Sequence, residues 1–311
     1  MFTKTDEPLK WQDLPDPVPA EDEVVIEVKA AGLCRTDVGI MHDPAWMPLV
    51  SAPVILGHEN AGIIKTLGSG VTGFKVGDRV GVAPQDKVTG KTVGAQRNGG
   101  YADLMAVPAR ELIPLPDEVS FEQGAAATDA GMSSYHPLFV VGGARKGMTV
   151  GIIGAGGLGQ FAVNMALIEG CHVCVADTSP KAREWAGDLG VRDVHEQVLD
   201  LKDDEPDLVV DFAGFGTTTN DAISVVRPGG MVVLVGMGRL QATIDTRPLI
   251  TRNVTLRGNN GGTPDDIAQV YRYFQTGKMK PSLVETTFAD IPEGLETLRK
   301  GGVTGRMIAL R

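Results

Sequence analysis

The sequence lacks the features that mark secreted, membrane-spanning and nucleic-acid-binding proteins. It has only three cysteines in 311 residues, an odd number that suits thiols or metal ligands better than a disulfide framework. No run of about 18 apolar residues occurs, and residues 1–7 show no basic start followed by an apolar stretch. No run of lysine and arginine offers a track for phosphates. We expect a cytoplasmic protein that binds neither membranes nor nucleic acid.

What the chain does contain is typical of a large, ordered globular protein. Hydrophobic residues make up 42% and charged residues 22%, and the net charge of −10 is spread along the sequence. A length of 311 residues exceeds what one hydrophobic core usually serves, so two domains are expected. The 40 glycines indicate many tight turns.

The first third of the sequence favours β-structure. Residues 23–30 and 60–67 read as strands, and residues 71–82 as short strands separated by turns. Residues 84–100 carry few apolar positions and predict a loop. This part therefore predicts a β-rich, barrel-like domain.

From residue 122 the pattern changes to small-residue helix and turn, and strands then alternate with helices. The alternation predicts a parallel, doubly wound sheet, so the chain as a whole is of the α/β class. We place the domains at 1–128 with 263–311, and at 129–262, because the final strand is expected to rejoin the first domain. The predicted elements are strands at 148–153, 171–176, 208–213, 231–235 and 306–310, and helices at 158–168, 265–275 and 292–299.

Two of the cysteines have a spacing that mimics a redox or zinc motif. Cys171 and Cys174 lie in the run Cys-His-Val-Cys-Val-Ala, which reads as a buried strand. Side chains three apart on a strand point to opposite faces, so we expect a structural role for both.

A glycine-rich turn follows the strand at 148–153 and opens a helix, which is the context that gives such a turn its mechanism. Gly154 permits the sharp bend, Gly156 lets the backbone approach a pyrophosphate, and Gly159 lets the helix pack close to the sheet. Gly157 and Leu158 complete the predicted phosphate site.

Asp177 ends the next predicted strand, where a carboxylate would hold the ribose hydroxyls of a dinucleotide. A carboxylate there repels a ribose 2′-phosphate, so NAD is predicted over NADP. Lys181 and Arg183 lie just downstream and leave that preference open.

Three possible zinc ligands lie far apart in the sequence. Taken singly, Cys34 is a small buried hydrophobe, His58 a hydrogen-bonded core or surface histidine, and Asp129 a turn or cap residue. No spacing rule links them. With their flanking segments, however, they resemble the zinc-containing alcohol dehydrogenases of the medium-chain dehydrogenase/reductase superfamily, from about residue 14 to the C-terminus. The shared motifs are 31–37, 57–59, 76–80, 99–102, the turn from Gly154 and the closing Gly305-Arg306.

The resemblance implies a GroES-like barrel domain, a Rossmann domain and a catalytic zinc. Cys34, His58 and Asp129 would bind the metal, with Glu59 as a transient ligand. Three protein ligands leave a fourth position for water or substrate. Asp37 would orient His58. The resemblance also implies that Arg35 and Arg306 reach the NAD phosphates.

The implied reaction is hydride transfer between an alcohol and NAD, with zinc as the Lewis acid and Thr36 passing the alcohol proton outward. In many relatives a histidine three positions later receives that proton, but Gly39 stands here, which leaves solvent or His42 as acceptors. Many relatives also have a lobe with four cysteines for a structural zinc. Residues 84–100 contain none, so one zinc per chain is predicted.

The expected substrate is a small or medium alcohol or ketone, with a secondary alcohol preferred. Its cleft would draw on apolar side chains, although each of these is more often a core residue. Oligomerisation through the nucleotide domain, as a homodimer or homotetramer, is also expected. Two alternatives remain: a zinc-free quinone or enoyl reductase of the same superfamily, and a non-catalytic NAD-binding protein. The candidate cleft residues are Trp46, Met47, Leu49, Tyr101 and Met105.

Overall fold

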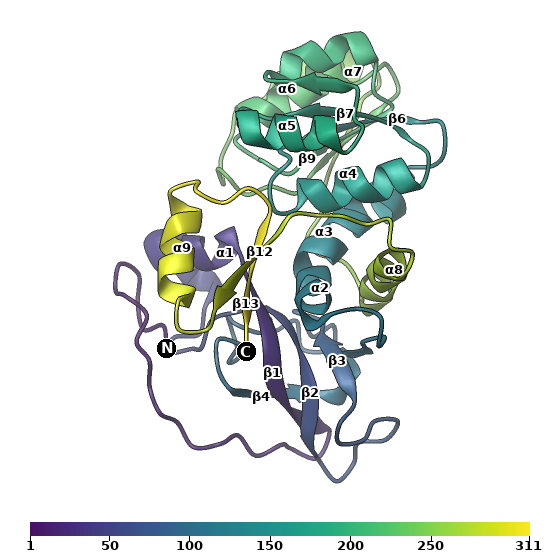
Figure 1. Cartoon of the computed structure of the whole chain (residues 1–311). Helices are drawn as coiled ribbons and strands as arrows, with labels where there is room; N and C mark the ends of the chain where they lie inside the picture. Colours follow the sequence, from purple (N-terminus) through teal and green to yellow (C-terminus); the bar gives the residue numbers. More distant parts are fainter. The chain divides into compact units, whose positions relative to one another are not determined.

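The computed structural model describes all residues from 1 to 311 and separates into two compact units (Figure 1). The first unit comprises Met1–Asp129, Thr263–Gln275 and Leu283–Arg311. The second comprises Ala130–Gly262 and Thr276–Ser282. None of the helices is both long and apolar enough to cross a membrane.

The first unit is built on a seven-stranded sheet centred on the long strand β1 (Glu23–Leu33). β1 pairs antiparallel with three other strands, and one of them is the last strand of the chain. The sequence prediction that the C-terminal strand returns to the first part of the chain is therefore confirmed. The other strands are β2 (Glu59–Leu67), β3 (Arg79–Val82), β4 (Leu104–Pro108), β5 (Leu112–Pro114), β12 (Leu283–Thr287) and β13 (Arg306–Leu310).

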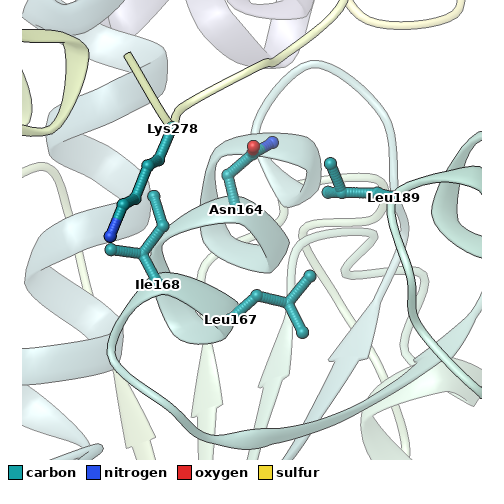
Figure 2. Close-up of a pocket in the computed structure, with 5 residues that line it drawn as sticks. All are labelled: Asn164, Leu167, Ile168, Leu189 and Lys278. Atoms are coloured by element: carbon teal, nitrogen blue, oxygen red, sulfur yellow. The ribbon is translucent and has the colours of Figure 1, made fainter. Parts of the chain in front are cut away.

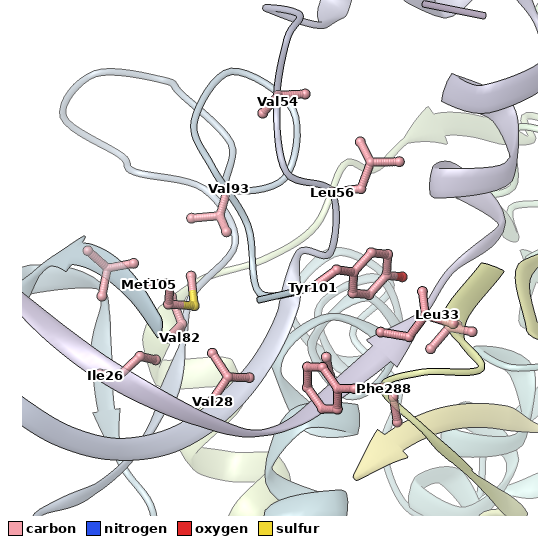
Figure 3. Packing of buried hydrophobic residues seen from close by; sticks show 14 of the residues in the cluster. Ile26, Val28, Leu33, Val54, Leu56, Val82, Val93, Tyr101, Met105 and Phe288 are labelled. Atoms are coloured by element: carbon pink, nitrogen blue, oxygen red, sulfur yellow. The ribbon is translucent and has the colours of Figure 1, made fainter. Parts of the chain in front are cut away.

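Apolar side chains from these strands and from the loops beside them form one core (Figure 3). Val24, Ile26 and Val28 alternate along β1 and are fully buried, as expected for a strand with one face on the core. Short helices flank the sheet. They are α1 (Arg35–His42), η1 (Pro44–Leu49), η2 (Ala109–Glu111), α2 (Phe121–Ala126), α8 (Pro264–Gln275) and α9 (Ile291–Arg299).

The second unit contains a six-stranded, wholly parallel sheet in the order β11-β10-β9-β6-β7-β8. The order runs outward from β6 in both directions, which confirms the predicted doubly wound arrangement. The strands are β6 (Thr149–Ile153), β7 (His172–Ala176), β8 (Asp193–His195), β9 (Leu208–Asp211), β10 (Met231–Leu234) and β11 (Thr255–Gly258).

Helices cover both faces of this sheet and create two separate cores. One core contains residues of α4 (Gly159–Ile168) and α5 (Pro180–Asp188), and the other contains residues of α6 (Thr217–Val225). Cys171 belongs to the first core and Cys174 to the second, and both are buried free thiols. The prediction of a structural role for these cysteines is confirmed. The remaining elements are α3 (Met132–Tyr135), η4 (His136–Val141), η5 (Val198–Asp204) and α7 (Arg247–Thr251).

One predicted stretch of strands is only partly correct. Residues 71–82 contain β3 from Arg79 onward, but residues 71–78 form turns rather than strand. Gly73 and Gly77 have φ angles of +84° and +93°, which extended strands do not use. The Gly and Asp positions of this segment therefore mark turns, and only its last residues belong to a strand.

The predicted loop at residues 84–100 has no strand or helix, and ion pairs with buried carboxylates hold it in place instead. Arg110 donates to both carboxylate oxygens of Asp86, at 3.1 and 2.8 Å. Arg97 donates to both oxygens of Glu111, each at 2.8 Å. Asp86 and Glu111 are each only 2% exposed. These two ion pairs hold the loop to the segment that follows β4.

The Asp86 pair predicts a measurable pH dependence of stability. Hydrogen bonds from Arg110 hold the pKa of Asp86 well below its usual range, so its stabilisation is complete above about pH 4 and is lost as the pH falls below that value. Asp86→Asn should cost about 2 kcal/mol at neutral pH, and the difference from wild type should shrink in acid. Denaturant unfolding at a series of pH values measures it.

The matched control is Asp117→Asn. The Asp117 side chain is 96% exposed and lies 3.4 Å from an Arg79 nitrogen, so this variant should match wild type throughout. A stability difference for Asp86→Asn that stays constant between neutral and acid pH would contradict the assignment.

Candidate functional site

Four side chains of the first unit converge on one point. The potential ligand atoms of Cys34, His58, Glu59 and Asp129 all lie within 4.8 Å of one another. The first three residues are buried and Asp129 is partly exposed. The structure thus brings together all three predicted zinc ligands and the predicted transient ligand, from segments that lie far apart in the sequence.

Cys34 follows β1 and caps the N-terminus of α1. The Thr36 amide lies 3.5 Å from the Cys34 sulfur, and the Cys34 amide donates to Oδ2 of Asp37 at 3.1 Å, forming a capping box. The sequence prediction did not include α1. Asp37 three residues after Cys34 was the available signal, but cysteine is an unusual residue at the cap.

Glu59 begins β2, and His58 stands just before it, directly after Gly57. Gly57 has a φ of +94°, which favours glycine at this turn. His58 Nδ1 lies 3.5 Å from Oδ1 of Asp37, and Asp37 is fully buried. The structure therefore places Asp37 beside the ring of His58, the position that the family resemblance implies for it. Gly32 lies opposite Glu59 in the β1–β2 ladder, and a Cβ there would come within 2.2 Å of Oε2 of Glu59.

Asp129 lies in η3 (Ala127–Gly131), a π-helical segment that follows α2. Single π-helical turns widen a helix and frequently occur at functional sites. Its Oδ2 lies 3.8 Å from the Cys34 sulfur and 3.6 Å from His58 Nε2. Asp129 thereby completes a set of one sulfur, one nitrogen and one oxygen.

This donor set suits zinc. Bonds of about 2.0–2.3 Å in a tetrahedral zinc site place the ligand atoms roughly 3.3–3.8 Å apart. The separations of 3.6 and 3.8 Å from Asp129 Oδ2 to the other two ligand atoms fall within that range. Three protein ligands would leave one position open, as catalytic zinc sites require.

A buried arginine neutralises the carboxylates of this cluster. Arg306, 4% exposed at the start of β13, donates from Nε to Oε2 of Glu59 at 2.9 Å and from its Nη2 to Oε1 of the same residue. The same Nη2 donates to Oδ2 of Asp129 at 2.9 Å. The family resemblance implies a role for Arg306 at the NAD phosphates and not these contacts, because no local pattern links Arg306 to Glu59.

Burial and charge act in opposite directions on the pKa values here. Burial lowers the pKa of His58, but the Asp37 charge and hydrogen bonds with Asp129, Asp37 and Cys34 outweigh it, so the pKa lies well above its ordinary value. Burial raises the pKa of Glu59, and the Arg306 guanidinium opposes that shift. The negative charge around His58 thus stabilises a positive charge on its ring.

Around the cluster, Arg35 is exposed and Thr36 half-buried at the start of α1. A Cβ on Gly39 would lie 2.8 Å from Cε2 of Trp46, so a larger residue at position 39 would collide with that ring. His42 lies six residues after Thr36, about 120° around the helix, and its Nδ1 is 3.6 Å from an Asp6 oxygen. This direction does not favour His42 as the acceptor of a proton from Thr36.

The candidate cleft residues differ in exposure. Tyr101 and Met105 are buried in the core of the first unit. Trp46 and Met47 are partly buried, and Leu49 is 52% exposed. Tyr101 and Met105 therefore have the core role that the sequence analysis favoured for each residue taken singly.

The glycine turn of the second unit has the geometry that dinucleotide binding needs. Gly154 has a φ of +85°, and a Cβ on Gly159 would lie 1.8 Å from the Gly154 oxygen, so both positions favour glycine. Nothing lies within 4 Å of a Cβ built on Gly156, which leaves the backbone open there. Gly157 and the half-buried Leu158 lead from this turn into α4.

Asp177 follows β7 beside this turn. Its Oδ2 accepts from the Ala155 amide and its Oδ1 from the Ser179 amide, each at 2.7 Å. These bonds fix the carboxylate against the glycine turn. Arg183 donates to the Asp177 backbone oxygen and lies 3.3 Å from Glu196, so it is already engaged.

A pocket of about 310 Å³ lies elsewhere on the second unit (Figure 2). Asn164, Leu167 and Ile168 of α4 line it together with Leu189 and Lys278. The Asn164 amide already donates to Gln160 and accepts from Lys280. The pocket shares no residue with the metal cluster or the glycine turn.

Two known families match this chain, one in each half of the sequence. A family described as "Alcohol dehydrogenase GroES-like domain" matches residues 20–117, and "Zinc-binding dehydrogenase" matches residues 157–276. An alcohol dehydrogenase of Geobacillus stearothermophilus is 30% identical over 97% of this chain and 96% of its own length. The chain belongs to the zinc-type alcohol dehydrogenases of the medium-chain dehydrogenase/reductase superfamily.

Solved structures and further curated proteins are also similar to this chain over nearly its whole length. The acetophenone reductase of Geotrichum candidum, solved in complex with NAD, superimposes with a TM-score of 0.91 at 28% identity and covers 100% of this chain and 96% of its own. The alcohol dehydrogenase of Aeropyrum pernix gives a TM-score of 0.92 at 25% identity, covering 100% and 98%. The L-galactonate-5-dehydrogenase of Escherichia coli is 29% identical over 93% of this chain and 91% of its own length.

Two glycine variants of this alcohol dehydrogenase should separate cofactor binding from folding. Gly156→Ala has room for its methyl group, so stability should change by less than about 1 kcal/mol, while the methyl group obstructs the pyrophosphate and weakens NAD binding about tenfold or more. Gly159→Ala meets the Gly154 oxygen and should lose about 1–3 kcal/mol. Denaturant unfolding and calorimetric NAD titration measure the two effects. Unchanged NAD affinity in stable Gly156→Ala protein would refute the phosphate role of the turn.

Proposed function

We propose that this chain is an NAD-dependent alcohol dehydrogenase with one catalytic zinc, acting on a small or medium alcohol, preferably secondary, or on the matching ketone. The observation that carries the proposal is the convergence of Cys34, His58 and Asp129 in a chain that also has the glycine turn. The acetophenone reductase is described as a complex with NAD, which supports the cofactor and the ketone class.

Cys34, His58 and Asp129 would hold the zinc, and Glu59 would be available as a temporary fourth protein ligand. Zinc bound there would supply Lewis-acid polarisation of the substrate oxygen. Arg306 donates hydrogen bonds to both Glu59 and Asp129. Its positive charge therefore lowers the free-energy cost of burying two carboxylates side by side. Asp129 would then share its charge between Arg306 and the metal.

The residues of the second unit would bind the cofactor. The backbone at Gly154, Gly156, Gly157, Leu158 and Gly159 would face the pyrophosphate at the N-terminus of α4. Asp177, fixed by the Ala155 and Ser179 amides, would accept hydrogen bonds from the adenosine ribose. Its charge would also repel a 2′-phosphate, which favours NAD over NADP.

The first unit would add charge and a proton path. Arg35 is exposed next to Cys34, and we infer that it pairs with a cofactor phosphate. Arg306 would join it only if cofactor or metal binding loosens its contacts with Glu59 and Asp129. Thr36 would pass the substrate proton outward to solvent. His42 points in another direction around the helix, and Gly39 has no side chain that could accept the proton.

We further propose a cytoplasmic homodimer or homotetramer without nucleic-acid or membrane partners. β11 is an edge strand that pairs only with β10, and three of its four residues are exposed. Ile250, on the helix just before β11, is 76% exposed. An open edge strand is a natural site for pairing with a second copy.

Metal analysis with an alcohol panel tests the function. Wild-type protein should contain about one zinc per chain, reduce NAD with alcohols and lose turnover with a chelator. Cys34→Ala should lose zinc and about a thousandfold or more in turnover, and keep its NAD affinity. Cys171→Ala, which removes a buried thiol of the second unit, is the matched control and should keep both zinc and turnover.

Two outcomes would overturn the proposal. Metal-free protein that still oxidises NADH with a quinone or an activated double bond would identify a zinc-free reductase. NAD binding without turnover on any alcohol or ketone would identify a non-catalytic binding protein.

The assembly is tested by measuring the molecular mass in solution. Light scattering behind size-exclusion chromatography should give twice or four times the chain mass of 32.8 kDa. A single monomeric species at micromolar concentration would contradict the β11 proposal and leave the catalytic one untouched.

A further inference from the structure

Tyr101 is a buried residue close to the metal cluster, and its hydroxyl donates a hydrogen bond to the carboxylate of Asp37. Its side chain belongs to the core of the first unit (Figure 3), and it is 7% exposed. The hydroxyl lies 2.8 Å from Oδ2 of Asp37 and 3.1 Å from the Gly32 backbone oxygen. Both are acceptors, so the single hydroxyl proton is donated mainly to the closer, charged oxygen.

Asp37 connects this hydroxyl to two of the proposed zinc ligands. Its Oδ2 also accepts from the Cys34 amide at 3.1 Å, while its Oδ1 lies 3.5 Å from His58 Nδ1. Oδ1 is buried and has no hydrogen-bond partner within bonding geometry, so the His58 ring is its nearest polar neighbour in the cluster. The Asp37 carboxylate therefore lies between the Cys34 backbone and the His58 ring, and the Tyr101 hydroxyl donates a hydrogen bond to it.

The ring of Tyr101 also fixes the backbone that leads to His58. A Cβ on Gly57 would lie 2.5 Å from Cδ1 of Tyr101, so the ring packs directly on that glycine. The Tyr101 amide donates to the Leu56 oxygen at 3.0 Å, and the Gly100 amide donates to the Gly57 oxygen at 2.9 Å. One residue thus contacts both the turn before His58 and the carboxylate beside it.

We propose that Tyr101 is a positioning residue of the metal centre, which acts through Asp37 to hold His58 and Cys34 in the geometry that binds zinc. The inference rests on the proposed zinc site. Because Nδ1 of His58 faces the Asp37 carboxylate, Nε2 is the ring nitrogen that remains to bind a metal. Without the tyrosine hydroxyl, Asp37 has fewer donors to fix its orientation, and the His58 ring is less well placed.

The direct test compares Tyr101→Phe with Tyr271→Phe. Tyr271 is also buried in the first unit, and its hydroxyl donates to a backbone oxygen, that of Gly124, at 3.3 Å. Each variant loses one buried hydroxyl, but only Tyr101 contacts Asp37. Zinc affinity, measured by competition with a chromophoric chelator, should fall about tenfold in Tyr101→Phe and less than about twofold in Tyr271→Phe.

A spectroscopic readout distinguishes positioning from a general loss of stability. With cobalt in place of zinc, the visible bands report the geometry of the ligands, including the Cys34 thiolate. These bands should shift in Tyr101→Phe and stay unchanged in Tyr271→Phe. Equal thermal destabilisation of both variants with unchanged bands and zinc affinity would overturn the proposal.

A double-mutant cycle tests whether Tyr101 acts through Asp37. Asp37→Asn alone should weaken zinc binding by about 10- to 100-fold. Adding Tyr101→Phe to it should change the zinc affinity by less than about twofold, because the carboxylate through which Tyr101 acts is already absent. A further tenfold loss in the double variant would show that Tyr101 acts independently. If Tyr101→Phe fails to fold, unchanged zinc affinity in Asp37→Asn still overturns the proposal.

The proposed function and this inference fail differently. Wild-type protein that does not bind zinc through Cys34 would remove the proposed function itself. Wild-type protein that binds one zinc, with Tyr101→Phe identical to it in affinity and in cobalt spectrum, would remove only the role of Tyr101.

Discussion

Burial of several acidic groups at one point is the constraint on which the rest of the first unit depends. Glu59 is fully buried, Asp129 lies beside it, and the Cys34 sulfur is 3.8 Å from Asp129. Such a cluster is costly to bury without a positive partner. Arg306 provides one, through hydrogen bonds to Glu59 and Asp129, and a metal ion would provide the second.

Strand pairing in the sheet of the first unit brings Cys34, Glu59 and Arg306 close together. In the β1–β2 ladder Gly32 faces Glu59, and in the β1–β13 ladder Leu33 faces Met307, the residue after Arg306. The end of β1 therefore lies beside the starts of β2 and β13, and Cys34 is the first residue after β1. The long-range pairing of the last strand with the first is thus part of the site, because it carries Arg306 to Glu59.

The sequence predicted what depends on local periodicity and turn chemistry. Apolar strands, the helix after Gly159 and the opposite faces of Cys171 and Cys174 follow from patterns a few residues long. No spacing rule connects Cys34 with Asp129, so that pairing came from family resemblance. The thiol cap of α1, the Arg306 bridge and the hydroxyl of Tyr101 were missed because each depends on tertiary contacts that no short pattern encodes.

X-ray absorption at the zinc edge of the metal-loaded protein tests the central claim most directly, since it reports which atoms bind the metal. The account predicts one sulfur at about 2.3 Å, from Cys34, with nitrogen and oxygen ligands at about 2.0–2.2 Å. A shell without sulfur, or one with two or more sulfurs, would contradict it, because the only other cysteines are Cys171 and Cys174, buried in the second unit.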